Sequence, residues 1–165
     1  MERFCAEMWP RLVSGLSLWC ENVAVAEELA QEALVRTWER WDRVRLADSP
    51  EAWTWRVAIN LSRSRRRRAG AERRAMRRLR ADAQPAADDP PSLDEDLRRA
   101  LLQLPPRQQQ AVVLRFVSDL PVASAAEAMD CAEGTVRALT HQGLEQLRLV
   151  LGVRPTDRKE VLPDG

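Results

Sequence analysis

The sequence predicts an all-α protein, built from two small helical domains joined by a flexible linker, with a helix-turn-helix in the second domain. Ala, Leu, Arg and Glu predominate, β-branched residues are sparse and tyrosine is absent. Apolar residues recur at intervals of three and four along most of the chain, which is the period of an amphipathic helix. The stretch 81–92, ADAQPAADDPPS, has no large apolar residue and is rich in Pro, Ala and Asp, as is typical of a linker.

The stretch from Ala24 to Trp41 predicts one long amphipathic helix with two different faces. One face is apolar and is expected to pack in a core; its members are Ala26, Leu29, Ala30, Ala33, Leu34, Thr37, Trp38 and Trp41. The other face carries long polar side chains at fixed spacing, namely Glu28, Gln31, Glu32, Arg36 and Glu39. By itself this polar face indicates only a surface exposed to water.

Two further helices are predicted on either side of this one. Residues 2–21 hold apolar side chains at helical spacing, with Pro10 as a kink or boundary: Phe4, Met8, Leu12, Leu16 and Trp19. Ser49, Pro50 and Glu51 predict a helix start, with a capping hydroxyl, proline in the first helical position and an acid in the first turn. That helix runs through Ala52, Trp55, Ala58 and Ile59 directly into a block of arginines.

Positive charge is concentrated in residues 63–80, which carry +9 although the whole chain carries +1. Trp53 and Trp55 precede this block, and residues two apart diverge on a helix, so at least one indole is expected to be partly exposed. Aromatic faces that stack on unpaired bases, beside arginines that hold phosphates, suit single-stranded nucleic acid. The alternative is a solvated helix end or a disordered basic tail.

The second domain begins with two predicted helices. Leu93, Leu97, Leu101 and Leu104 mark a helix that ends at Pro105 and Pro106, and residues 107–117 form the next, with Ala111, Val112, Leu114 and Phe116 toward a core. Residues 120–148 then predict a helix-turn-helix, with its turn at Asp130 and Cys131 and its second helix opening at Glu133. In such motifs the N-terminal residues of the second helix enter the major groove. A generic three-helix packing unit would show the same pattern.

Neither a metal site, a cofactor site nor catalysis is expected. Cys5, Cys20 and Cys131 show no CxxC spacing, and His141, the single histidine, has no second ligand at metal-site spacing. No residues supply a base, its orienting partner and an oxyanion site together, so the chain is not expected to be an enzyme. Scattered cysteines without a secretion signal or membrane-spanning segment predict a cytoplasmic location.

Four motifs follow one another along the chain in the order found in a known protein family. They are EELAQEALVRTWERWDRV, SPEAWTWRVAINLSRSRRRR, LPPRQQQAVVLRFVSDL and CAEGTVRALTHQGLEQLR. Over about residues 1–150 the chain resembles the extracytoplasmic-function group of bacterial RNA polymerase sigma factors, in its SigE-like actinobacterial branch. The resemblance implies an alternative sigma factor whose partners are core RNA polymerase and promoter DNA. An anti-sigma factor is usual in the wider family, although some SigE-like members lack one, so this partner stays open. The resemblance also implies four parts: a domain that binds the polymerase clamp and melts the downstream promoter element (1–80), a linker (81–92), a domain that reads the upstream element (93–152) and a tail (153–165).

The resemblance also assigns roles to individual residues. Glu28, Gln31, Glu32 and Arg36 match the face that binds the polymerase clamp, with Trp38 and Trp41 on the buried side of that helix. Residues 42–49 match the loop that accepts a flipped base, and Asn60, Arg63, Arg65 and Arg66 match the helix that contacts the melted strand. Glu133, Thr135, Arg137 and His141 match positions of the helix that reads the upstream element.

The second domain departs from the family pattern in ways that bear on DNA binding. Pro121 and Ala132 stand where the family has serine caps, and each lost cap costs about 1 kcal/mol. Ala125 replaces a larger aliphatic residue, Gln142 replaces an arginine, and residues 119–150 carry −3. We expect this domain to bind duplex DNA poorly unless polymerase tethers it. Two alternatives stay open: a degenerate sigma-like protein that occupies polymerase or an anti-sigma factor, and a free-standing helix-turn-helix regulator.

Overall fold

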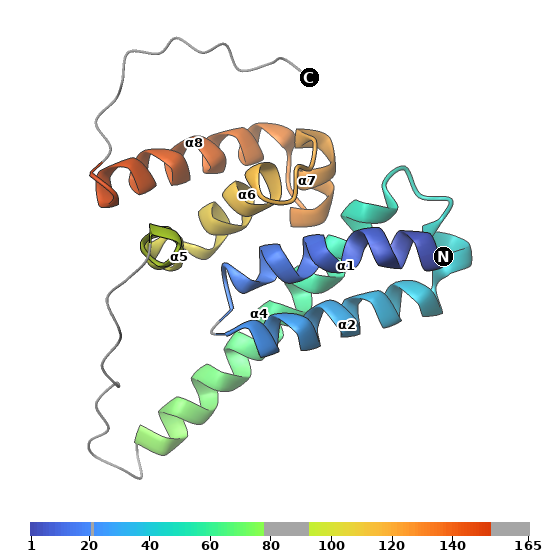
Figure 1. Cartoon of the computed structure of the whole chain (residues 1–165), viewed down its shortest axis with the longest axis horizontal. Coiled ribbons are helices and arrows are strands. Elements are labelled where there is room, and N and C mark those ends of the chain that lie inside the picture. Colours follow the sequence, from blue (N-terminus) through green and yellow to red (C-terminus); the bar gives the residue numbers. More distant parts are fainter. Residues whose placement is uncertain (21, 78–92, 153–165) are drawn as a thin grey trace.

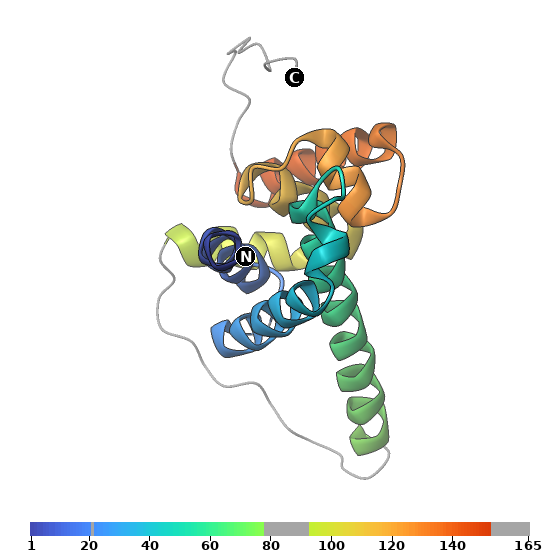
Figure 2. The ribbon, with the colours of Figure 1, turned by 90° about the vertical axis from the view of Figure 1, so that its right-hand side faces the viewer.

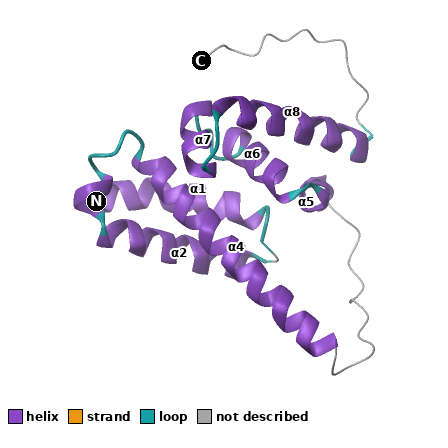
Figure 3. Cartoon of the chain, turned by 180° about the vertical axis from the view of Figure 1, so that it is seen from behind, coloured by secondary structure: helices purple, strands orange, loops and turns teal. Residues whose placement is uncertain are grey.

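The computed structural model describes residues 1–20, 22–77 and 93–152, and every regular element within these ranges is an α-helix (Figures 1 and 3). The helices are α1 (Glu2–Ser17), α2 (Val23–Glu39), α3 (Trp41–Val44), α4 (Pro50–Arg77), α5 (Leu93–Gln103), α6 (Pro106–Phe116), α7 (Val122–Met129) and α8 (Glu133–Val150). The predicted all-α class is confirmed. The predicted linker, 81–92, and tail, 153–165, lie outside the described residues.

The first domain is built on α1 and α2, which lie antiparallel, with α4 packed across α2 (Figure 1). Met8, Leu12 and Leu16 of α1 are buried, and they face a side of α2 on which three of the six buried residues are alanine. Small side chains let the two helix backbones approach closely, while the larger partners supply the buried apolar area. Pro10 lies inside α1 and does not end it, so of the two alternatives for this proline, a kink or a boundary, the boundary is wrong.

The predicted core face of α2 is confirmed up to Thr37 and is wrong at Trp38. Thr37 is buried, and its hydroxyl donates to the Ala33 carbonyl oxygen at 2.7 Å. A neighbouring residue is rotated by about 100° around the helix axis, and Trp38 is accordingly 66% exposed. The helix also ends at Glu39 rather than Trp41, because the backbone of Arg40 leaves the helical region before α3 restarts.

The start of α4 agrees with the helix start predicted from the sequence. The Ser49 hydroxyl oxygen accepts a hydrogen bond from the Ala52 N–H at 3.1 Å, and Pro50 is the first helical residue. Trp55 is fully buried whereas Trp53 is half-buried, which confirms that the two indoles diverge. The C-terminal part of α4, which carries the arginine block, projects away from the other helices (Figures 1 and 2).

The second domain contains the predicted helix-turn-helix. Asp130 adopts a left-handed backbone (φ 55°) that ends α7, and α8 opens three residues later. Neither α7 nor α8 has a side-chain N-cap, as Pro121 and Ala132 predict. One core prediction in this domain is wrong: Phe116, the last residue of α6, is 53% exposed, because α6 buries the face that includes Val113 and Leu114.

The two domains pack against each other, with α4 of the first lying on α7 of the second. Arg11 of α1 donates to the Ser118 carbonyl oxygen at 2.6 Å, and Gln109 of α6 donates to the Leu18 carbonyl oxygen at 3.2 Å. Apolar side chains of both domains form one continuous cluster of buried residues. The two domains therefore share one continuous core, in addition to the core inside each domain.

Candidate nucleic-acid interface and adjoining surfaces

The arginines of α4 form the most basic surface in the described chain. Arg65, Arg66, Arg67 and Arg68 are all exposed on the projecting part of the helix, and Asn60 is exposed one turn earlier. Arg65 is anchored to α2, because its Nη1 lies 2.7 Å from Oε2 of Glu28. Exposed guanidinium groups spaced along a helix can hold successive phosphates of a nucleic-acid strand.

Arg63 differs from the other predicted strand-binding arginines. It is half-buried where α4 meets the second domain, and its Nη2 donates to Oε1 of Gln110 at 3.1 Å. Burial, and next the nearby Arg107, lower the pKa of the Arg63 guanidinium below its ordinary value. In this arrangement Arg63 therefore faces the second domain rather than open solvent.

A cleft of about 480 Å³ opens beside Trp53, at the predicted base-accepting loop. Its lining residues are Arg40, Arg43, Val44, Leu46, Ala47, Trp53 and Arg56. The half-buried indole can stack on a flat base, and the three guanidinium groups beside it can neutralise the phosphate of that nucleotide. The predicted base-accepting loop, 42–49, includes Arg43, but Arg40 and Arg56 were not predicted, because they join Trp53 only in the fold.

The outer face of α2 carries the residues predicted to bind the polymerase clamp. Glu28, Gln31, Glu32 and Arg36 are all exposed, so the structure brings them together on one accessible surface. Arg36 and Glu32 form an ion pair one turn apart, at 2.8 Å between Nε and Oε1. Because Glu28 pairs with Arg65, this face adjoins the arginine surface of α4.

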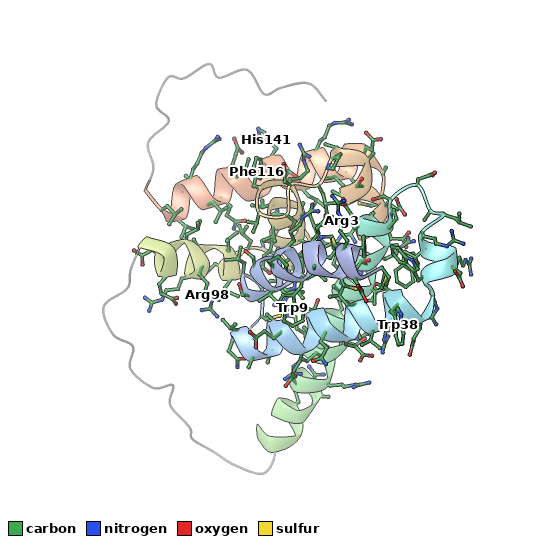
Figure 4. The ribbon with its side chains drawn as sticks, turned by 45° about the vertical axis from the view of Figure 1, so that its right-hand side comes forward. Arg3, Trp9, Trp38, Arg98, Phe116 and His141 are labelled. Atoms are coloured by element: carbon green, nitrogen blue, oxygen red, sulfur yellow. The ribbon has the colours of Figure 1, made fainter. Side chains whose placement is uncertain are left out.

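An exposed apolar patch that the sequence analysis missed adjoins this polar face. It surrounds a shallow pocket of about 290 Å³ lined by Cys5, Trp9, Gln31, Leu34, Val35 and Trp38. Trp9, Val35 and Trp38 are 39%, 41% and 66% exposed, and Trp38 lies near the end of α2 that is remote from α5 (Figure 4). Neighbouring exposed apolar side chains with a polar rim are typical of a protein-binding surface.

The predicted reading positions at the start of α8 are all exposed. Glu133, Arg137 and His141 are four residues apart and share one stripe of the helix, whereas Thr135 lies on a different side. Arg137 Nη2 lies 2.8 Å from Oε2 of Glu133, so the basic group of this stripe is already paired within the helix. His141 lies on the outer side of α8, away from α1 and α2 (Figure 4).

The described residues also bear on metal binding and on membrane insertion. Within them, no group of three or more His, Cys, Asp or Glu side chains is arranged to hold a metal ion. None of the described helices is both long enough and apolar enough to cross a membrane.

Two family models match the chain: Sigma-70 region 2 over residues 7–72, and Sigma-70, region 4, over residues 94–147. The chain is 35% identical over 142 residues to the RNA polymerase sigma-E factor of Streptomyces avermitilis, covering 81% of this chain and 75% of that protein. It is 29% identical over 141 residues to the extracytoplasmic-function sigma factor SigW of Bacillus subtilis, covering 77% of this chain and 75% of that protein.

A solved structure shares the fold of the chain. It is the Bartonella quintana sigma factor RpoE in complex with the anti-sigma factor NepR, with a TM-score of 0.78 and 24% identity, covering 95% of this chain and 98% of that one. At this identity the likeness concerns the fold, and it extends over both helical domains.

Two helical domains, an arginine-lined helix and a helix-turn-helix, together with these matches, define a transcription initiation factor. The chain belongs to the extracytoplasmic-function family of RNA polymerase sigma factors, which confirms the predicted resemblance, Streptomyces sigma-E factors included. It is an alternative sigma factor, which binds core RNA polymerase and directs promoter recognition.

Proposed function

We propose that residues 1–80 bind the clamp of core RNA polymerase and open the downstream promoter element, and that residues 93–152 read the upstream element. Residues 81–92 would then link the two domains, with 153–165 as a tail. The observation that carries this assignment is that α4 has the Trp53 cleft at its start and a projecting arginine surface further along, while the outer face of α2 remains exposed. One face can then bind protein while the other binds DNA.

Polymerase binding is assigned to the outer face of α2 and the apolar patch beside it. Glu28, Gln31, Glu32 and Arg36 would form polar contacts around the exposed ring of Trp38. Interfaces of this kind concentrate their binding energy in a few aromatic or arginine side chains with a polar rim. Trp38 is the exposed side chain on this face that fits that role best.

Melted promoter DNA is assigned to α4 and the loop before it. Asn60, Arg63, Arg65 and Arg66 would contact the separated strand and its phosphates, while the Trp53 cleft would take a flipped base. Extracting a base from the stack costs about a few kcal/mol, which stacking and cationic contacts inside the cleft would offset. Holding the melted strand and a flipped base requires no covalent bond to be made or broken by the protein. We therefore propose that the protein is not an enzyme.

Upstream recognition is assigned to the start of α8, through Glu133, Thr135, Arg137 and His141. Because residues 119–150 carry −3, this domain would bind duplex DNA weakly alone and would depend on polymerase to bring it to the promoter. The protein would act in the cytoplasm, where polymerase and the chromosome are.

An anti-sigma partner is also proposed. The Bartonella quintana RpoE is described as a complex with the anti-sigma factor NepR, and its fold matches that of this chain over both domains. The uncapped α7 and α8 favour a second candidate, a degenerate sigma-like protein that occupies polymerase or an anti-sigma factor without starting transcription.

Run-off transcription with core polymerase from a related bacterium on fragmented genomic DNA separates these candidates. We expect specific start sites with the wild-type chain, and loss of them with Gln31→Ala/Glu32→Ala and with Arg65→Ala/Arg66→Ala. Polymerase binding without start sites would favour the degenerate occupant. No polymerase binding at all would overturn the assignment of the α2 face.

A further inference from the structure

The contact between the two domains contains a polar cluster centred on Asp130. The Asp130 carboxylate at the end of α7 forms an ion pair with Arg56 of α4. Next to it, Arg107 of α6 donates to the Met129 carbonyl oxygen at 3.0 Å, and Arg63 of α4 donates to Gln110 of α6. Asp130 also lies close enough to Arg63 to act on its charge. One carboxylate of the second domain thus pairs with Arg56 and lies near Arg63, both of them on α4.

The position of this carboxylate is fixed by the backbone of the helix-turn-helix. Asp130 is the C-cap of α7, with a left-handed backbone (φ 55°) and an N–H that donates to the carbonyl oxygens of Ala126 and Glu127. Asp and Asn adopt this conformation more readily than other residues with a side chain. A negative group is therefore held in place against α4 whenever the domains are packed together.

The two arginines near Asp130, Arg56 and Arg63, are also proposed to bind DNA. Arg56 lines the Trp53 cleft, and Arg63 is one of the residues assigned to the melted strand. A phosphate and a carboxylate make the same kind of charge-assisted hydrogen bonds with guanidinium groups. The α7 contact and a DNA strand would therefore compete for this side of α4.

The packing between the domains near Gly15, a second part of their contact, is imperfect, which makes opening feasible. The Trp55 indole N–H and the Ser118 hydroxyl are buried without a hydrogen-bond partner. Trp55 belongs to the first domain and Ser118 to the second, and both approach Gly15, at 2.6 and 3.1 Å from a Cβ built there. Burying unpaired polar groups costs free energy, which would be recovered when the domains separate and water reaches them.

We propose that Asp130 is an internal substitute for a DNA phosphate, and that its ion pair with Arg56 is autoinhibitory. In the packed form, Asp130 occupies Arg56; a single strand displaces it, and the second domain swings away to read its own element. This inference rests on the proposed role of α4 in binding the melted strand.

The test measures binding of the full-length chain to a labelled single-stranded oligonucleotide of about 15 nucleotides. Asp130→Asn removes the charge but keeps a residue that tolerates the left-handed backbone. Asp119→Asn is the matched control, because Asp119 is also exposed and left-handed (φ 49°) in the same domain, and no ion pair is found for it among the described residues. Amide exchange of residues 122–129, with and without oligonucleotide, reports opening of the contact.

We expect Asp130→Asn to tighten oligonucleotide binding about three- to five-fold, the upper part of the range measured for exposed ion pairs. Asp119→Asn should change it less than about 1.5-fold, because salt screens a distant charge. In the wild-type chain, saturating oligonucleotide should speed amide exchange in α7. Equal tightening by both variants would overturn the proposal, since it would reflect overall charge alone.

The Arg65→Ala/Arg66→Ala variant distinguishes a failure of this inference from a failure of the proposed function on which it rests. If that variant binds the oligonucleotide more weakly while Asp130→Asn binds as the wild type does, the α4 surface stands and the autoinhibitory contact is overturned. If Arg65→Ala/Arg66→Ala binds as tightly as the wild type, α4 is not the strand-binding surface, and both assignments are overturned.

Discussion

Arg65 of α4 and Glu28 of α2 form an ion pair, with 2.7 Å between Nη1 and Oε2. The pair links the helix proposed to hold melted DNA with the helix proposed to bind polymerase. The two side chains are 48% and 64% exposed, so water and salt screen their attraction. The contact therefore positions two functional surfaces relative to each other while adding little to folding stability.

The first prediction separates the functional role of Arg65 from its structural role. Arg65→Ala should lower the free energy of unfolding by less than about 1 kcal/mol, as exposed ion pairs do. It should nevertheless reduce transcription from specific start sites several-fold, because a phosphate contact is lost. Urea unfolding and run-off transcription measure the two effects. Arg3→Ala is the control: it removes an exposed pair with Glu7 on α1 and should leave transcription unchanged.

The second prediction contrasts two tryptophans with opposite exposure. Trp38→Ala should leave stability nearly unchanged but weaken binding to core polymerase by about 2 kcal/mol or more, as loss of a central interface aromatic does. Trp55 is fully buried, and Trp55→Ala should lower the free energy of unfolding by about 3–5 kcal/mol. Titration of labelled core polymerase and urea unfolding provide the comparison. Wild-type polymerase affinity in Trp38→Ala would remove the apolar patch from the proposed interface.

The sequence predicted most of the fold because local rules and tertiary packing agree there. Ser49 before Pro50 gives a helix start by local chemistry, and the structure has that cap. The alanine-rich face of α2 repeats with the helical period, so its burial against Met8 and Leu12 could be predicted without knowing the partner helix. The turn at Asp130 is likewise set by residues next to one another in the chain.

The features that the sequence did not predict depend on which elements meet in three dimensions. Trp38 and Phe116 continue apolar stripes, but no described helix covers them, and periodicity carries no information about where a covering helix ends. The Trp53 cleft combines side chains from the α2–α3 junction, α3, the following loop and α4, so its arginines come together only in the fold. The Asp130–Arg56 contact joins residues 74 positions apart and follows from domain packing alone.

A third prediction concerns the missing cap of α8. Ala132 already has the extended backbone of an N-cap residue (φ −70°, ψ 150°), so a hydroxyl placed there can accept from the first turn without rearrangement. Ala132→Ser should raise the free energy of unfolding by about 1 kcal/mol. Ala138→Ser, an exposed position inside the same helix, is the control and should lower it by about 0.5 kcal/mol. Thermal unfolding of the two variants should therefore shift in opposite directions.

The fourth prediction uses two glycines of α8 that have different surroundings. A Cβ at Gly143 would lie 2.7 Å from Cγ2 of Val112 on α6, so Gly143→Ala should overpack this contact and cost about 1–3 kcal/mol. A Cβ at Gly134 would meet nothing within 4 Å, so Gly134→Ala should stabilise by up to about 1 kcal/mol through helix propensity. Urea unfolding checks both values. Stabilisation by both variants would mean that α6 and α8 pack less closely than described.

The last prediction concerns the ion pair at the reading end of α8. Arg137 is held by Glu133 at 2.8 Å, so its charge is partly neutralised before DNA arrives. Glu133→Gln should free Arg137 for one more phosphate contact, which would steepen the fall of log K with log salt by about 0.9 on duplex DNA. Because phosphate contacts carry no sequence information, promoter and scrambled duplexes should gain affinity equally.

Glu145→Gln provides the matched control for this experiment. It removes the same charge from the same helix, but Glu145 faces His141 at 3.9 Å rather than an arginine, so no new phosphate contact should appear. Fluorescence anisotropy of the full-length chain at several salt concentrations measures both slopes. A loss of affinity in Glu133→Gln for the promoter duplex alone would contradict this prediction. It would instead indicate that Glu133 accepts a hydrogen bond from a base edge, as acidic side chains do from cytosine.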